Sequence, residues 1–117
     1  PFLTMTTQTK VSIDVAAHPL YPVLIAAIEQ AMYGKGERHG GAVTPFLEQP
    51  WRHYATLHGR GFLTGQAAKK LEEAASLRTG EAFIAEALGA IVYTGMAIIT
   101  ERGVLDATQI YDDKGPK

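Results

Sequence analysis

The fold of this chain depends most on residues 82–99, which read AFIAEALGAIVYTGMAII. Projected at about 100° per residue, this stretch has almost no polar face, so the sequence predicts a helix that its neighbours cover nearly all round. Its length approaches that of a membrane span, but it contains Glu86 and two glycines and has no flanking pattern of basic or aromatic residues. We therefore predict a buried helix of a soluble protein, with no membrane partner.

Helix signals lie on both sides of this stretch. Thr79 predicts a capped start and Gly103 predicts the end of the helix. A preceding helix is predicted to begin at a Thr64 cap and to end before Gly80, and the short turn there would make the two helices antiparallel neighbours. The predicted buried face of that preceding helix consists of Ala67, Ala68, Leu71, Ala74 and Ala75.

The first half of the chain predicts two shorter helices. One begins at residues 21–23, ends at residue 32 or 33, and carries an apolar stripe of Leu24, Ile25, Ile28 and Met32. The other covers residues 50–57 after a short turn. A glycine-rich loop occupies residues 34–41, and the alternation over residues 10–15 predicts a short strand or an extended arm. The predicted fold class is all-α: a small bundle of about four helices with a short N-terminal extended segment, completed by oligomerisation.

Length and composition predict a single domain. The chain has 117 residues, of which 46% are hydrophobic and 20% charged, values near the averages of globular proteins. We expect residues 1–9 to be disordered or left over from cloning, with Met5 as the native start. The helical domain would then cover residues 10–111 and a flexible tail residues 112–117.

Charge and cysteine content exclude several function classes. Eleven basic residues against twelve acidic ones give a formal net charge of −1, so the chain lacks the positive charge by which proteins bind nucleic-acid polymers. With no cysteine there is no disulfide framework, no thiolate zinc site and no cysteine nucleophile, and we expect a cytoplasmic protein.

The most informative single residue of the long apolar helix is Glu86. Leaving a carboxylate unpaired among apolar neighbours would cost several kcal/mol, so a bound cation, a basic side chain or protonation could compensate it. The alternative is that Glu86 reaches solvent through the first turn of the helix. Glu72, on the facing helix, could join Glu86 in a magnesium site. The alternative is that residues 69–73 form an ordinary solvated face with helix charge pairs.

Two glycine-flanked loops could offer donors to phosphate oxygens. One contains Arg38 and His39, and the other covers residues 58–61. Such loops are also common as plain turns, and neither matches a P-loop or a dinucleotide-binding fingerprint. Trp51, between a proline and an arginine, is predicted to anchor the core or a subunit interface.

Three short motifs carry a resemblance to a known family. They are Lys-Leu-Glu-Glu-Ala at residues 70–74, Glu-Ala-Leu-Gly at residues 86–89 and Ala-Met-Tyr-Gly-Lys-Gly at residues 31–36. Together they resemble the all-α MazG-like nucleoside triphosphate pyrophosphohydrolases, and the phage dATP/dGTP diphosphohydrolase-like branch in particular. The resemblance covers about residues 22–103.

The resemblance implies a magnesium-dependent site. Glu72, Glu73 and Glu86 would hold the metal, with Glu72 and Glu86 in the catalytic role. The residues implied to bind a nucleoside triphosphate substrate are Arg38, His39, Lys69 and Lys70. The chain departs from the family pattern at Gly89, where the second motif has an aspartate. The first motif also lacks the carboxylate expected three residues after Glu72 or Glu73.

Two function hypotheses follow from the sequence. One is a MazG-like nucleotide-binding or nucleoside triphosphate pyrophosphohydrolase domain with magnesium as its cofactor. The other is a non-catalytic oligomeric helical module that binds a protein partner or a small molecule, because the apolar side chains of residues 82–99 point to several sides of one helix. A homodimer or homotetramer is compatible with both.

Overall fold

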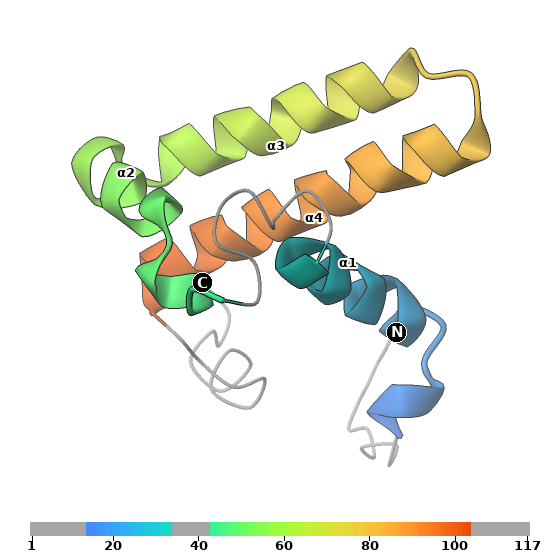
Figure 1. Cartoon of the computed structure of the whole chain (residues 1–117), viewed down its shortest axis with the longest axis horizontal. Coiled ribbons are helices and arrows are strands. Elements are labelled where there is room, and N and C mark those ends of the chain that lie inside the picture. Colours follow the sequence, from blue (N-terminus) through green and yellow to red (C-terminus); the bar gives the residue numbers. More distant parts are fainter. Residues whose placement is uncertain (1–13, 34–42, 104–117) are drawn as a thin grey trace, which may run out of the picture.

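The computed structural model describes residues 14–33 and 43–103. In this part of the chain the elements are η1 (Val15–Ala17), α1 (Tyr21–Tyr33), η3 (Phe46–Glu48), α2 (Pro50–His58), α3 (Arg60–Ala75) and α4 (Gly80–Arg102). The described residues contain four α-helices and no strand, so the predicted all-α fold is confirmed (Figure 1).

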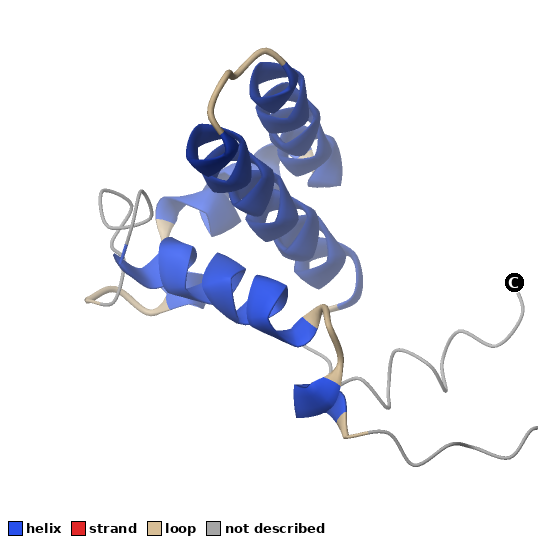
Figure 2. Cartoon of the chain, turned by 90° about the vertical axis from the view of Figure 1, so that its right-hand side faces the viewer, coloured by secondary structure: helices blue, strands red, loops and turns tan. Residues whose placement is uncertain are grey.

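The helices are arranged around α4. It runs antiparallel to α3, with which it forms the largest helix contact of the fold, and a short connection at residues 76–79 joins the two (Figure 1). We call this pair the α3–α4 hairpin, and its antiparallel arrangement was predicted. On the other side of α4, α1 crosses the hairpin at a steep angle, as Figure 2 shows. The short α2 packs at the end where α3 begins.

Local signals explain the ends of α4. The Thr79 hydroxyl accepts a hydrogen bond from the Ala82 backbone N–H at 3.1 Å, which caps the helix, and Glu81 lies in the first turn, where the helix dipole favours a carboxylate. Gly103 ends the helix with a positive φ of 82°, a conformation that glycine adopts at little cost. Both ends agree with the sequence prediction.

The predicted start of α3 is wrong by one turn. The helix begins at Arg60, not at a Thr64 cap, and the Thr64 hydroxyl donates to the Gly61 carbonyl at 3.3 Å. The break between α2 and α3 rests on Gly59 alone, whose φ of 77° turns the chain within one residue. The rest of the predicted loop at residues 58–61 is therefore helical.

The N-terminal segment also differs from the prediction where the structure describes it. Asp14 is extended, but its carboxylate accepts a hydrogen bond from the Ala16 N–H at 3.0 Å and caps the 3₁₀ turn that starts at Val15. Val15 therefore belongs to a helical turn rather than to a strand. Residues 10–13 lie outside the described part of the chain.

The core gathers at the junction of α2, α3 and α4. Its buried members are Trp51, Ala55, Leu63, Met96 and Ala97, against which Phe46, Phe62, Val92, Tyr93 and Ile99 pack. On α3 the inward row begins at Leu63 and continues through Ala67 to Ala74, whereas the predicted members Ala68, Leu71 and Ala75 are exposed. The prediction was right for Ala67 and Ala74, and it left out Leu63 because it placed that residue before the helix. Lys70, at the same spacing, falls within the inward row.

Within the described part of the chain, α4 is less covered than predicted. Phe83, Ile84 and Ile98 are about half exposed, and only 22% of its most apolar 18-residue window is buried. The apolar stripe of α1 is likewise open at Leu24 and Ile28. By length and composition alone α4 could cross a membrane, but the core helix of a soluble protein passes the same test. The fold is compatible with a soluble protein.

Gly59 and Gly65, near the start of α3, should respond oppositely to alanine. Gly65→Ala is expected to raise the free energy of unfolding by about 0.5–1 kcal/mol, because the position is helical and an added Cβ meets nothing within 4 Å. Gly59→Ala should lower it by about 1–2 kcal/mol, since alanine at φ 77° is strained. Urea denaturation of both variants measures the difference. Equal effects would show that Gly59 does not form the sharp turn described here.

Candidate functional site

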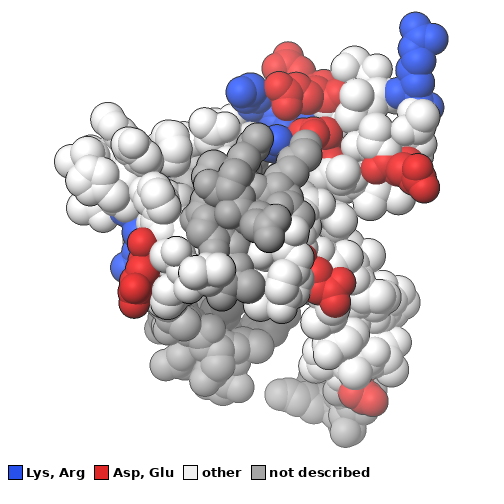
Figure 3. Space-filling model, in the orientation of Figure 1, with Lys and Arg blue, Asp and Glu red and all other residues white. Residues whose placement is uncertain are grey.

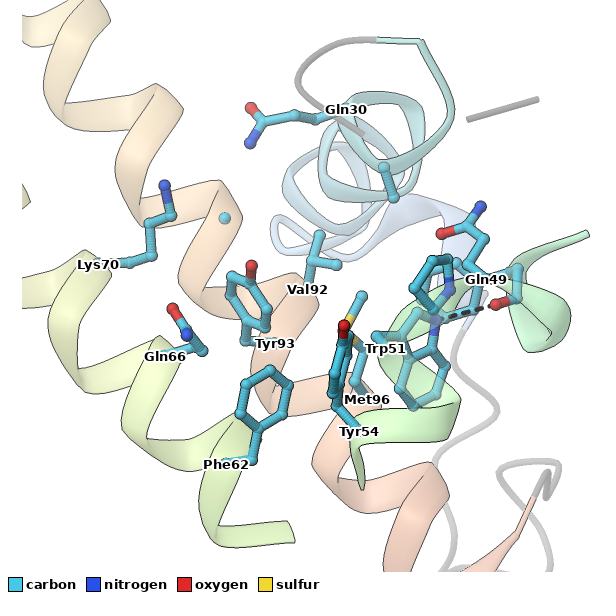
Figure 4. A pocket seen from close by; sticks show the side chains of 14 residues that line it. Gln30, Gln49, Trp51, Tyr54, Phe62, Gln66, Lys70, Val92, Tyr93 and Met96 are labelled. Carbon is cyan, nitrogen blue, oxygen red and sulfur yellow. Dashed lines mark hydrogen bonds between the residues drawn. The ribbon is translucent and has the colours of Figure 1, made fainter. Parts of the chain in front are cut away.

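A pocket of about 280 Å³ opens between the four helices. One end of it is aromatic, and Figure 4 shows Trp51, Tyr54, Phe62 and Tyr93 around it. The Trp51 ring lies 5.1 Å from the Phe46 ring, centroid to centroid, and the rings of Tyr54 and Phe62 are 5.9 Å apart. These spacings are typical of packed aromatic pairs, so this end of the pocket has firm apolar walls.

Hydrogen bonds from the segment before α2 hold Trp51 in place. Its indole N–H donates to the Phe46 carbonyl at 2.8 Å, and the buried Gln49 amide donates to the Thr44 carbonyl at 3.0 Å. The Arg52 guanidinium lies 5.7 Å from the centre of the Trp51 ring. Trp51 is thus a core anchor, which confirms the first of the two roles predicted for it. Its side chain also lines the pocket.

The other end of the pocket is polar. Gln30 from α1, Gln66 and Lys70 from α3, and Tyr93 from α4 lie around it (Figure 4), and Gly89 also lines the pocket. The Gln30 amide donates to the Ala85 carbonyl at 3.1 Å and so joins α1 to α4. We call this region the polar end of the pocket.

Lys70, which lines the polar end, forms an ion pair with Glu86. The Lys70 Nζ is 3.1 Å from the Glu86 Oε1, and the two side chains are only 19% and 15% exposed. Of the three ways predicted to compensate Glu86, the structure shows the basic side chain. Because both charges are largely removed from water, each is costly without the other, and the pair fixes α3 against α4 at this point.

The structure does not gather the other predicted site residues around Glu86. Lys69, Glu72 and Glu73 are exposed on α3, and Arg38 and His39 lie outside the described residues. Figure 3 shows the main cluster of charged side chains over the α3–α4 hairpin. Residues 14–33 and 43–103 contain no group of three or more His, Cys, Asp or Glu side chains that could hold a metal ion.

Sequence reasoning missed most of the pocket lining. Phe62, Gln66 and Lys70 are spaced by four residues on α3, and they face Gly89, Tyr93 and Met96 on α4. Each row follows one helix face, which is the signal that could have found them. The spacing on α3 was overlooked because the sequence prediction started that helix at Thr64, after Phe62.

The lining defines what the pocket can bind. Aromatic rings at one end favour a flat apolar ring, and the amides at the other end offer donors and acceptors to its polar edge. Comparisons with protein-family models, curated proteins and solved structures found no match to this chain. The described residues thus form a small helical domain with a pocket that is aromatic at one end and polar at the other.

Removing one partner of the Lys70–Glu86 pair should destabilise the fold. Lys70→Met is expected to lower the free energy of unfolding by about 3 kcal/mol, because it leaves the Glu86 carboxylate largely buried without its cation. The double variant Lys70→Met with Glu86→Gln should recover most of that loss. Urea denaturation of the single and double variants measures the coupling.

The exposed pair between Arg60 and Glu101 serves as the control. Their side chains are 60% and 54% exposed, so Arg60→Gln should cost less than about 1 kcal/mol. If Lys70→Met is no more harmful than Arg60→Gln, or if the double variant is as unstable as the single one, the Lys70–Glu86 pair does not hold the hairpin.

Proposed function

We propose that this protein is a nucleotide-binding helical domain whose pocket holds the base of a nucleoside triphosphate or a related nucleotide. The observation that carries the proposal is the pocket itself, in which aromatic side chains surround one end and amide groups the other. A nucleobase is a flat ring system with donors and acceptors on its edge, and proteins commonly hold such rings between aromatic side chains and amides.

The volume of the pocket suits the base of a nucleotide rather than a whole nucleotide. Pockets for complete small-molecule ligands enclose about 300–1,000 Å³, and the 280 Å³ here lies just below that range. A base and part of its sugar would fill the space between Trp51 and Gln66. The phosphates would then lie outside the aromatic end. The cytoplasm, expected from the absence of cysteine, has abundant nucleotides.

The described residues do not fit the magnesium site that the resemblance implies. Magnesium requires several oxygen ligands in near-octahedral geometry, whereas Glu86 pairs with Lys70 and both Glu72 and Glu73 are exposed. We therefore propose binding as the function and derive no hydrolytic step. Pyrophosphate release with magnesium remains the prediction of the family resemblance and is measured alongside binding.

One observation favours the second function hypothesis, an oligomeric module. Ile84, Ile91 and Ile98 recur every seven residues on α4, and the outer two are about half exposed. Residues seven apart lie on the same side of a helix, so Ile84 and Ile98 leave apolar surface exposed on one side of α4. A second copy of the chain is therefore the proposed partner of this face.

Nucleotide binding can be tested with the fluorescence of Trp51, the single tryptophan of the chain. The four deoxynucleoside triphosphates and the four ribonucleoside triphosphates are titrated with and without magnesium. A bound base in the pocket should change the emission and raise the melting temperature by mass action. The same samples are assayed for pyrophosphate.

Gln66→Leu should lower the affinity for the nucleotide that binds most tightly by about three- to tenfold, because it removes one hydrogen-bonding amide from the lining and leaves the aromatic side chains in place. Ala68→Leu, which introduces the same side chain at an exposed position of the same helix, is the matched control and should bind normally. The absence of any fluorescence change or thermal shift across the panel would refute nucleotide binding.

Association through α4 can be tested by sedimentation equilibrium. The wild-type protein is expected to be a dimer or tetramer, and Ile84→Glu should shift it to the monomer because a carboxylate cannot be buried in an apolar seam without a partner. Ser76→Glu adds the same charge at an exposed position beyond α3 and should keep the assembly. A wild-type monomer at tens of micromolar would exclude this interface.

A further inference from the structure

Ile84, Ile91 and Ile98, which we call the isoleucine row, form a pattern on α4 that is symmetric about its middle residue. We infer that two copies of the chain pack α4 against α4 in antiparallel orientation, with a twofold axis at Ile91 and Glu81 of each copy next to Arg102 of the partner subunit. This inference rests on the second proposed function, association through α4. It adds the orientation and register of the two copies and the charged pair that selects them.

The helix α4 has three sides, and the other helices cover two of them. One side carries Ala97, which is buried in a cluster with Leu63 of α3. A second side lies beside Gln30 of α1, whose amide donates to the Ala85 carbonyl. At about 100° per residue the isoleucine row points to the third side, roughly 120° from both. In the described part of the chain the outer two members of this row are about half exposed. One further helix on this side would complete the cover of α4.

The residues along the third side read alike from both ends. Ile84 lies seven residues before Ile91, and Ile98 lies seven residues after it. A twofold interface requires such a pattern, because each residue i that contacts j on the partner is matched by j contacting i. In an antiparallel pair centred on Ile91, Ile84 of one copy lies opposite the partner's Ile98, and Ile91 lies opposite its own equivalent. The exposed apolar row of each copy then covers that of the other.

Small residues beside the row allow the two helices to approach closely. Ala87 and Gly95 lie one turn before and one turn after Ile91. Glycine destabilises the interior of a helix, and a Cβ atom added to Gly95 would meet nothing within 4 Å in this structure. The axes of packed helices lie about 8–10 Å apart, depending on the side chains at the contact. A second α4 seated on the row at close distance accounts for the small residue at this position.

The charges at the two ends of α4 select the antiparallel orientation. Glu81 lies in the first turn and Arg102 in the last, and both are exposed. They are ten and eleven residues from Ile91, so the partner's Arg102 comes level with Glu81 to within about 1.5 Å along the axis. Both lie on the same flank of the isoleucine row, about 80° and 20° from Ile91, and the twofold axis brings equal flanks together. A parallel pair would place like charges side by side.

The first test uses disulfide cross-linking, for which the wild-type chain is suited because it has no cysteine. Single cysteine variants are oxidised with copper phenanthroline in air and analysed by non-reducing electrophoresis. Ile91→Cys is expected to form a covalent dimer, because equivalent positions at the axis of closely packed helices come within reach of a disulfide. Ile84→Cys and Ile98→Cys should link poorly alone but should link to each other when the two reduced proteins are mixed before oxidation. Ser76→Cys, at an exposed position beyond α3, measures linking by random collision.

The second test reverses charges and measures the dissociation constant of the dimer by sedimentation equilibrium. Glu81→Arg should raise the dissociation constant about three- to tenfold at low ionic strength, because it brings like charges together at two symmetric positions. The double variant Glu81→Arg with Arg102→Glu exchanges the two members of the pair and should restore the wild-type value. Glu72→Arg makes the same charge change at an exposed position of α3 and should leave the dissociation constant unchanged. Melting temperatures verify that the variants are folded.

A pair of glycine variants tests the close approach of the helices. Gly95→Leu should weaken the dimer at least tenfold, because the larger side chain would hold the two α4 helices apart. Its melting temperature should show a folded protein, since the space around the added Cβ is open. Gly65→Leu introduces the same side chain at an open position of α3 and should keep the dimer.

The outcomes separate this inference from the proposed functions. If Ile84→Cys and Ile98→Cys each link to themselves as well as Ile91→Cys does, the pair is parallel, and the inference is overturned while association through α4 stands. A wild-type monomer with no linking above that of Ser76→Cys would overturn both, and nucleotide binding is judged by its own titration. Linking through Ile91→Cys, together with loss of affinity in Glu81→Arg and its recovery in the double variant, would establish the antiparallel dimer.

Discussion

The ion pair between Lys70 and Glu86 is the constraint on which the rest of the structure depends. It joins the two long helices through charges that are mostly withdrawn from water, so any sliding or rotation of α3 against α4 that separates them has a large free-energy cost. Gln30 binds the same turn of α4 from the other side, through the Ala85 carbonyl. Three helices are therefore fixed relative to one another within a single turn of α4, and the polar end of the pocket follows from that arrangement.

The pocket exists because the size of the side chains changes along the hairpin. Toward the connection the buried residue of α3 is small, namely Ala74. Toward α2 the side chains are large, with Phe62 and Met96, and they hold the layers further apart. Gly89 and Lys70 line the space between these regions, and the stem of Lys70 lies next to Gly89. The position at which the family resemblance expects an aspartate is thus the one against which the lysine stem packs.

Capping chemistry made the ends of α4 and the start of α2 predictable, because Thr79, Gly103 and Pro50 act on their own neighbours. The start of α3 was mispredicted since Gly59 can turn the chain alone, and a threonine four residues later resembles a cap without being one. The need to compensate Glu86 could be predicted from its apolar surroundings, but the choice of Lys70 as its partner depends on which face of α3 turns inward. The pocket was missed for the same reason: its aromatic wall joins residues from separate helices, and only the packed fold brings them together.

The proposed ligand pocket and the proposed oligomer seam use different sides of α4. Ile84 and Tyr93 are nine residues apart, which places them about 180° from each other around the helix, whereas Ile84 and Ile98 lie within about 40°. The face that carries the exposed isoleucines is therefore turned away from the Tyr93 side of the pocket. A second copy could cover Ile84 and Ile98 without closing the aromatic end. The proposed binding and the proposed assembly would then be compatible properties of one helix, whose Tyr93 side lines the pocket and whose Ile84 and Ile98 side is about half exposed.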